Sequence, residues 1–167
     1  MLIFITGFMG VGKSTIGKAI SEKLNYPFID LDEVIEKDQG LSIASIFEKH
    51  GEDHFRLLEE KMLQQIIKKS KKAIFSLGGG TIFNKHISSL ILSHGICIYL
   101  EKSWENIEID LHTLHKRPLI QQKTQQQLKA LFHEREPFYS RSQLKVPINV
   151  TFDVQKLTNY LKLLTNR

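Results

Sequence analysis

A glycine-rich segment near the N-terminus constrains this chain more than any other feature. Gly7-Phe-Met-Gly-Val-Gly-Lys-Ser14 fits the pattern G-x-x-x-x-G-K-[ST], and Thr15 follows it. The segment comes directly after the apolar run 2–6, which predicts a buried strand, and before a helical pattern over residues 14–24. Glycines let successive backbone N–H groups converge on phosphate oxygens at the positive end of a helix. The segment therefore predicts a nucleoside triphosphate site, in which Lys13 meets the β- and γ-phosphates and the Ser14 hydroxyl binds Mg²⁺.

This segment leaves the class of nucleotide-binding protein open. A switch GTPase would need a guanine-reading motif such as N-K-x-D, but Asn84-Lys-His-Ile87 lacks the aspartate. A motor ATPase normally has an apolar strand that ends in a metal-binding aspartate, whereas the strand expected after residue 72 ends in Ser76-Leu-Gly78. The nearest acidic candidate is Asp30-Leu-Asp32, after the short apolar pair Phe28-Ile29. We expect this strand to lie beside the phosphate-loop strand, where one carboxylate can serve the metal's water shell and the other a substrate hydroxyl.

Apolar runs and helical patterns alternate along the rest of the chain. Further strands are expected at residues 73–77, 95–100 and about 146–152. Helices are expected at residues 32–38, 42–50, 53–70, 126–135 and 154–164, whereas residues 102–125 are polar and weakly periodic. Strands that alternate with helices predict a parallel sheet covered on both faces. Because the sequence has no repeat and no linker, we expect residues 1–167 to form a single α/β domain.

The composition is that of an ordinary globular protein. Of 167 residues, 41% are hydrophobic and 25% are charged, which argues against a disordered or fibrous chain. The lone cysteine, Cys97, excludes an internal disulfide and fits a reducing cytoplasm. No apolar run is long enough to cross a membrane, and the N-terminus does not have the features of a signal peptide. The net charge of +5 favours anionic partners, either nucleic acid or phosphorylated and carboxylated small molecules.

Six motifs in a fixed order carry a resemblance to a known family. They are G-x-x-G-x-G-K-S-T at residues 7–15, D-x-D at 30–32, I-F…G-E-x-x-F-R-x-x-E at 46–59, G-G-G at 78–80, R-P-L at 117–119 and E-R-x-P-x-Y at 134–139. The set resembles shikimate kinase from residue 3 to about 139. The resemblance implies transfer of the γ-phosphoryl group of ATP to the 3-hydroxyl of shikimate, a step toward chorismate and the aromatic amino acids. It also implies a five-stranded parallel sheet in a three-layer sandwich of the nucleoside-monophosphate-kinase type. We further expect the protein to be a cytoplasmic monomer.

The resemblance also implies roles on the acceptor side. Residues of about 32–60 would form the shikimate-binding segment. Arg56 and Arg135 suit the shikimate carboxylate, because a guanidinium binds a carboxylate in bidentate fashion. Glu59, one helical turn beyond Arg56, would hold that arginine in place. Asp32 would accept a shikimate hydroxyl as a candidate base. The ring's apolar side would meet Phe47 and Phe55, and close backbone approach would come from Gly78, Gly79 and Gly80.

On the nucleotide side, residues of about 109–123 would form a mobile lid. Arg117 of this lid would stabilise the charge that develops on the transferring phosphoryl group. Asp30 would reach Mg²⁺ through a water molecule. Asp110 stands where family lids often carry an arginine that flanks the adenine, so no residue is assigned to the adenine. The residues expected to bind ATP are Gly10, Val11, Gly12, Lys13, Ser14, Thr15 and Arg117.

Two other functions remain to be weighed. Another small-molecule P-loop kinase, such as a gluconate kinase, is disfavoured by residues 51–56 and 78–80, since those kinases carry different acceptor motifs. A non-catalytic module that binds nucleic acid would need a basic surface. The dense basic run Lys68–Lys72 lies at an expected helix end, where cations meet the negative dipole, and has no interleaved aromatic residues. We therefore expect ATP and shikimate as partners, with neither nucleic acid nor membrane.

Overall fold

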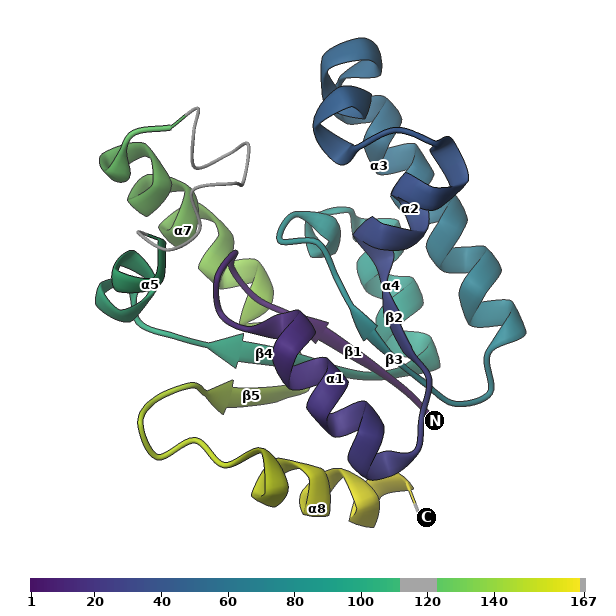
Figure 1. Ribbon diagram of the computed structural model, residues 1–167, viewed down its shortest axis with the longest axis vertical. Helices are drawn as coiled ribbons and strands as arrows, with labels where there is room; N and C mark the ends of the chain where they lie inside the picture. The colour runs from purple at the N-terminus through teal and green to yellow at the C-terminus, as the bar shows by residue number, and fades with distance from the viewer. Residues whose placement is uncertain (112–122, 166–167) are drawn as a thin grey trace.

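A five-stranded sheet with the strand order β2-β3-β1-β4-β5 forms the centre of the computed structural model, which describes residues 1–111 and 123–165 (Figure 1). All of its neighbouring strands are parallel. The strands are β1 (Leu2–Thr6), β2 (Phe28–Asp30), β3 (Ala73–Ser76), β4 (Gly95–Glu101) and β5 (Leu144–Pro147). The expected α/β fold class, with a five-stranded parallel sheet, is confirmed.

The middle strand, β1, carries the phosphate loop and is buried along its whole length. Its position between β3 and β4 explains why its sequence is continuously apolar rather than alternating. Phe4 is in register with Phe75 on one side, where the two rings stack with their centroids 4.9 Å apart, and with Cys97 on the other. The phosphate loop is therefore anchored to a strand that is fully buried in the core.

Helices cover both faces of the sheet. Helices α1 (Lys13–Leu24) and α8 (Val154–Thr165) pack together on the face toward the viewer in Figure 1, and α4 (Lys85–His94) lies on the opposite face. Gly17 allows α1 to approach the sheet closely, because a β-carbon there would lie 3.3 Å from Ile5 and still nearer to the Phe28 ring. Because Gly17 has no side chain, α1 packs closely against β1 and β2.

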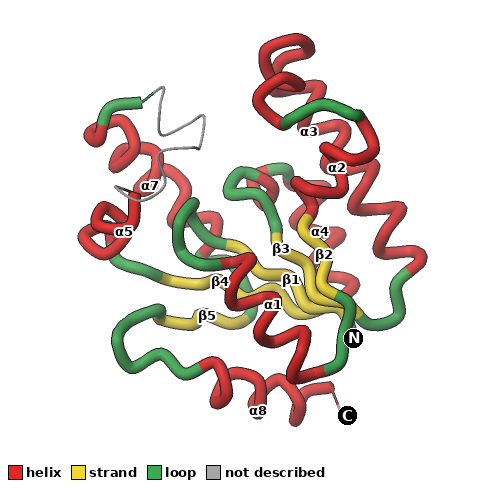
Figure 2. Tube along the Cα trace, viewed as in Figure 1, coloured by secondary structure: helices red, strands yellow, loops and turns green. Residues whose placement is uncertain are grey.

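Two helices connect β2 to β3 and rise away from the sheet (Figures 1 and 2). Helix α2 (Leu31–Gln39) ends at Gly40, whose φ of 63° is left-handed. Helix α3 (Ile43–Lys69) begins at Ser42, whose side chain accepts a hydrogen bond from the Ser45 N–H at 3.1 Å. Gly51 interrupts α3 with φ 80° and ψ 172°, so the two helices expected at 42–50 and 53–70 join there at a kink.

The helices depart from the expected elements in three places. Helix α5 (Trp104–Leu111) lies in a stretch expected to be irregular, and its buried Trp104 and Ile107 provide an apolar contact one turn apart. Helix α7 (Gln125–Tyr139) continues beyond the expected residue 135 and includes Pro137. The short 3₁₀ helix η1 (Thr81–Phe83) and α4 follow β3, in a stretch where no helix was expected.

The strand expected at about 146–152 is wrong in its bounds, because β5 covers residues 144–147. The Gln143 side chain begins the pairing with β4: its Oε1 accepts from the Cys97 N–H at 2.7 Å and its Nε2 donates to the Gly95 carbonyl at 3.2 Å. After Pro147 the chain turns at Asn149, whose Oδ1 accepts from the Thr151 N–H at 3.0 Å. The amide side chain of Gln143 thus sets the strand's start, and the Asn149 turn sets its end. Within residues 1–111 and 123–165, no helix combines the length and apolar character that a membrane span requires.

Candidate active site

Three groups of expected site residues meet at the carboxyl ends of neighbouring strands. The phosphate loop follows β1, Asp30 ends β2 and begins α2, and the glycine turn at residues 78–80 follows β3. Because β1, β3 and β2 are adjacent and parallel, all three segments lie at one edge of the sheet (Figure 1). The arrangement is the one expected for a ligand site of an open α/β sheet.

The phosphate loop wraps around the Lys13 side chain. The Lys13 ammonium donates to the carbonyl oxygens of Gly7 at 2.9 Å and Phe8 at 3.0 Å. Gly10 (φ 83°) and Gly12 (φ 90°) adopt left-handed conformations that disfavour side chains. Since Gly12 stands at the N-cap of α1 and has no side chain, the first N–H groups of the helix are not capped by it. The positive end of α1 is therefore available to an anionic ligand.

A cluster of oxygen atoms lies beside this loop. The Ser14 hydroxyl donates to Asp30 Oδ2 at 2.8 Å and lies 3.4 Å from the Ser76 hydroxyl. The other Asp30 oxygen accepts from the Asp32 N–H at 3.2 Å and so caps α2. Hydroxyl and carboxylate oxygens are the donors that Mg²⁺ prefers, usually together with water and phosphate oxygens. Among the residues that the structure describes, no group of three or more His, Cys, Asp or Glu side chains gathers into a metal site.

Arg56 is held by two carboxylates of its own helix. Its Nη1 donates to Glu59 Oε2 at 2.5 Å, and its Nη2 donates to Glu52 Oε1 at 2.7 Å. Glu52 is largely exposed, whereas the Glu59 side chain is fully buried. Burial alone would lower the pKa of Arg56, but the attraction of Glu59 and Glu52 outweighs it and raises the pKa. The guanidinium therefore stays positive, and its position is fixed before any ligand arrives.

The glycine turn brings the two expected arginines to one place. A β-carbon on Gly80 would lie 2.9 Å from Arg56 Cζ, and one on Gly79 would lie 3.4 Å from an Arg135 Nη. A β-carbon on Gly78 would lie 3.1 Å from an oxygen of Asp32. Arg56, Arg135 and Asp32 come from α3, α7 and α2, so they are far apart in the sequence. Side chains at Gly80 and Gly78 would crowd Arg56 and Asp32, whereas a β-carbon at Gly79 would make an ordinary contact with Arg135.

Aromatic rings support both arginines. The Arg135 guanidinium lies over the Phe83 ring at 5.3 Å, and Arg56 lies over the Phe55 ring at the same distance. Phe55 is buried, and its ring centroid is 4.8 Å from that of the partly buried Phe47. These phenylalanines therefore pack into the core and also line the side of α3 that carries Arg56.

Two residues that contact the glycine turn were not assigned a role from the sequence. The buried Tyr139 hydroxyl donates to the Gly79 carbonyl, and the buried Thr81 hydroxyl donates to Glu59 Oε1 at 2.5 Å. Tyr139 belongs to the E-R-x-P-x-Y motif, so the sequence marked the residue. The motif did not indicate that its hydroxyl would bind the Gly79 carbonyl. Thr81 follows the third glycine, and only its contact with α3 identifies it.

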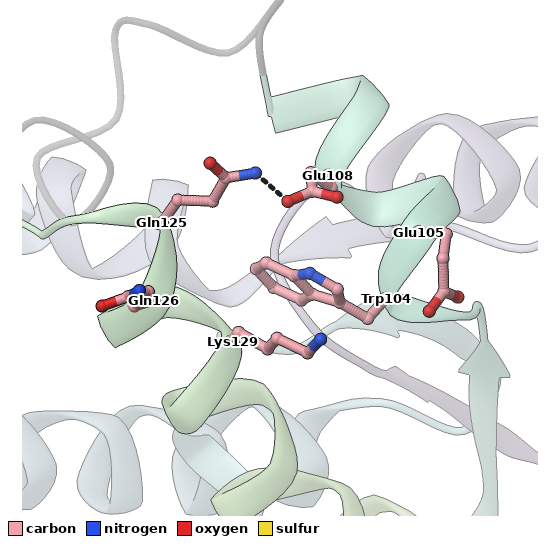
Figure 3. Close-up of a pocket in the computed structure, with 6 residues that line it drawn as sticks. All are labelled: Trp104, Glu105, Glu108, Gln125, Gln126 and Lys129. Atoms are coloured by element: carbon pink, nitrogen blue, oxygen red, sulfur yellow. Dashed lines mark hydrogen bonds between the residues drawn. The ribbon is translucent and has the colours of Figure 1, made fainter.

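The expected lid is described only in part. Arg117 lies outside the described residues, as does the R-P-L motif. Asp110, near the end of α5, forms an ion pair with Lys102. A hollow of about 200 Å³ lies between α5 and α7 (Figure 3), and none of its lining residues is an expected site residue. The hollow is lined by Trp104, Glu105, Glu108, Gln125, Gln126 and Lys129.

Comparisons with known proteins agree on one family. The family model described as shikimate kinase matches residues 9–162. The shikimate kinase of Bacillus subtilis is 40% identical over 146 residues, which cover 86% of this chain and 78% of that protein. The shikimate kinase of Sulfurihydrogenibium sp. is 37% identical over 144 residues, covering 86% of each chain.

Solved structures give the same result. The shikimate kinase of Acinetobacter baumannii, in complex with shikimate, is 30% identical with a TM-score of 0.87, and the match covers 99% of this chain and 94% of that one. A gluconokinase of Sinorhizobium meliloti shares only the fold, at 17% identity and a TM-score of 0.54 over 98% and 93% of the two chains. The gluconate-kinase alternative is therefore not favoured. The chain belongs to the shikimate kinase family, a family of ATP-dependent kinases.

Proposed function

We propose that this chain transfers the γ-phosphoryl group of ATP to the 3-hydroxyl of shikimate, giving shikimate 3-phosphate and ADP. The observation that carries the proposal is the glycine turn at residues 78–80, where Arg56 lies at Gly80, Arg135 at Gly79 and Asp32 at Gly78. Two cations and a carboxylate around a turn without side chains suit a small ring that carries one carboxylate and several hydroxyls. The phosphate loop at the neighbouring strand end supports ATP as the donor.

On the acceptor side, Arg56 and Arg135 bind the shikimate carboxylate. Arg56 is pre-positioned by Glu59 and Glu52, so little side-chain freedom is lost when the ligand binds. Asp32 accepts the proton of the attacking hydroxyl or orients that hydroxyl, and Gly78, Gly79 and Gly80 allow the ring to approach the backbone. In this scheme residues 32–60 act as the acceptor-binding segment.

On the donor side, residues Gly10 to Thr15 enclose the phosphates of ATP. Lys13 exchanges its contacts with the Gly7 and Phe8 carbonyls for the β- and γ-phosphate oxygens. Ser14 and, through water, Asp30 are the residues that would hold Mg²⁺, which neutralises phosphate charge when it is bound. Arg117 adds a positive charge near the transferring group from a lid at residues 109–123. Together these groups position the reactants and neutralise charge, which is most of what phosphoryl transfer requires.

We further propose that the chain acts in the cytoplasm as a monomer and has no nucleic-acid partner. The position of the basic run Lys68–Lys72 supports the absence of a nucleic-acid partner, since the run lies at the C-terminal end of α3 and in the turn that follows. Lys72 lies over the Tyr26 ring at 5.6 Å. The run thus has a local role at a helix end.

The test is ADP release with Mg²⁺-ATP and a panel of acceptors: shikimate, gluconate and AMP. Only shikimate should support turnover, and comparable turnover with gluconate or AMP would contradict the proposal. Lys13→Ala should abolish turnover. Arg56→Ala and Arg135→Ala should each weaken shikimate binding by about 2–4 kcal/mol while ATP binding changes little. Arg141→Ala is the matched control, since Arg141 is an exposed arginine just after α7 that lies over the Phe138 ring.

A further inference from the structure

Thr81 connects the glycine turn to α3 through both its backbone and its side chain. Its N–H donates to the Gly78 carbonyl at 3.2 Å and so closes the turn. Its hydroxyl donates to Glu59 Oε1 at 2.5 Å, across 22 residues of sequence. Both side chains are fully buried, so water does not compete for this hydrogen bond. The turn and the helix are thus connected at one buried point.

Glu59 has one partner for each of its two oxygens. Oε1 accepts from Thr81, and Oε2 accepts from Arg56 Nη1 at 2.5 Å. Burial raises the pKa of Glu59, and the attraction of Arg56 and the hydrogen bond from Thr81 oppose that rise. A buried carboxylate that lost one donor would be poorly satisfied and would either rotate or take up a proton. In either case it would hold Arg56 less firmly.

We propose that Thr81 is a positioning residue for the acceptor, because its hydroxyl fixes the Glu59 carboxylate that in turn fixes the Arg56 guanidinium. The proposal rests on the proposed function, in which Arg56 binds the shikimate carboxylate. It extends that function to a side chain that acts through two others. A β-carbon on Gly78 would lie 2.9 Å from Thr81 Oγ1 and 3.2 Å from Glu59 Oε1, so this pair also borders the turn next to Asp32.

The informative variants are Thr81→Val, which keeps the shape and removes the hydroxyl, and Thr81→Ser, which keeps the hydroxyl. Thr81→Val should raise the KM for shikimate about tenfold, as expected when one hydrogen bond to a charged group is lost, with little change in kcat or in the KM for ATP. Thr81→Ser should restore most of the affinity for shikimate. A role in stability alone would lower the melting temperature without this separation of the two KM values.

A double-mutant cycle tests the route through Arg56. In an Arg56→Ala background, Thr81→Val should cause no further rise in the KM for shikimate. Additive effects would overturn the proposal, as would a fall in kcat with an unchanged KM. If Thr81→Val is too unstable to purify, Thr81→Ala takes its place, with shikimate binding measured by calorimetry at low temperature.

The wild-type assay separates the two proposals. If the wild-type chain shows no shikimate-dependent ADP release, the proposed function fails, and the role of Thr81 fails with it. If the wild type turns over shikimate and Thr81→Val has an unchanged KM, only the role of Thr81 fails.

Discussion

Replacing Gly80 by alanine should displace Arg56 without disturbing the fold. Gly80 has φ −111° and ψ −8°, which an alanine adopts without strain. The added β-carbon would approach Arg56 Nη2 most closely, and it would lie 2.9 Å from Cζ and 3.0 Å from Nη1. Carbon atoms in contact prefer about 3.5–4.0 Å, so the guanidinium must retreat by roughly half an ångström or more. Because the obstacle is the far end of a flexible side chain, the backbone can stay in place.

This retreat should weaken shikimate binding. Arg56 would leave its contacts with Glu59 and Glu52 and would no longer meet a carboxylate in bidentate fashion. Loss of one hydrogen bond to a charged group is worth about 1.5–3 kcal/mol, or roughly a 10- to 100-fold rise in Kd. Titration calorimetry with shikimate measures this directly. ATP binding and the melting temperature serve as controls, and both should change little.

A double mutant distinguishes displacement of Arg56 from a direct clash between the new methyl group and the ligand. If Gly80→Ala acts through Arg56, it should have no further effect on shikimate affinity in an Arg56→Ala background. Wild-type affinity in the single mutant would refute the steric argument. Fully additive losses would show that the methyl group acts on the ligand instead.

Three further predictions concern other residues. Asp32→Asn should lower kcat by about 10²–10³ while shikimate and ATP still bind, and a kcat within a few-fold of wild type would remove Asp32 from the proton-accepting role. Tyr139→Phe should lower the free energy of unfolding by about 1–2 kcal/mol in urea titrations, because the Gly79 carbonyl loses its buried donor; an unchanged value would show that this hydrogen bond is not stabilising. Burial raises the pKa of the Cys97 thiol from 9.0 to about 11, so the thiol should resist alkylation at pH 8 until urea unfolds the chain. Since the unfolded thiol ionises first, wild type should lose stability relative to Cys97→Ala as the pH rises from 9 to 11, by up to about 2–3 kcal/mol, and a pH-independent difference would contradict this.

The parts of the fold that local chemistry specifies could be predicted from the sequence. The phosphate loop, the strand at residues 2–6 and the Ser42 cap each depend on residues within a few positions of one another. The kink at Gly51 was also foreseeable, because a glycine at a helix end favours the left-handed conformation found there. Helix α5 was not foreseeable, since Trp104 and Ile107 alone give too weak a periodic signal. The start of β5 depends on the Gln143 side chain, which imitates a strand backbone only in three dimensions.

In the candidate site, too, local motifs could be predicted from the sequence, whereas contacts between distant segments could not. Motifs identified the residue types, including Lys13, Arg56 and Arg135. They could not show that Arg56 and Arg135 lie at neighbouring glycines of one turn, because that contact joins α3 and α7 across the sheet edge. Thr81 was missed because a threonine after a glycine has no signature of its own. The role proposed for it depends on a hydrogen bond to a residue 22 positions away.

The order of the strands has an evolutionary consequence. Helices α2 and α3 leave the end of β2 and return to its neighbour β3, so most of the proposed acceptor-binding segment is a single insertion between these two strands. The phosphate loop follows β1, and β1 is paired with β3 on one side and β4 on the other. Mutation and recombination can therefore alter the insertion while leaving the donor loop in its setting. A sheet of this design is suited to diversification, in which one inherited means of handling phosphate is kept and the molecule that receives it is changed.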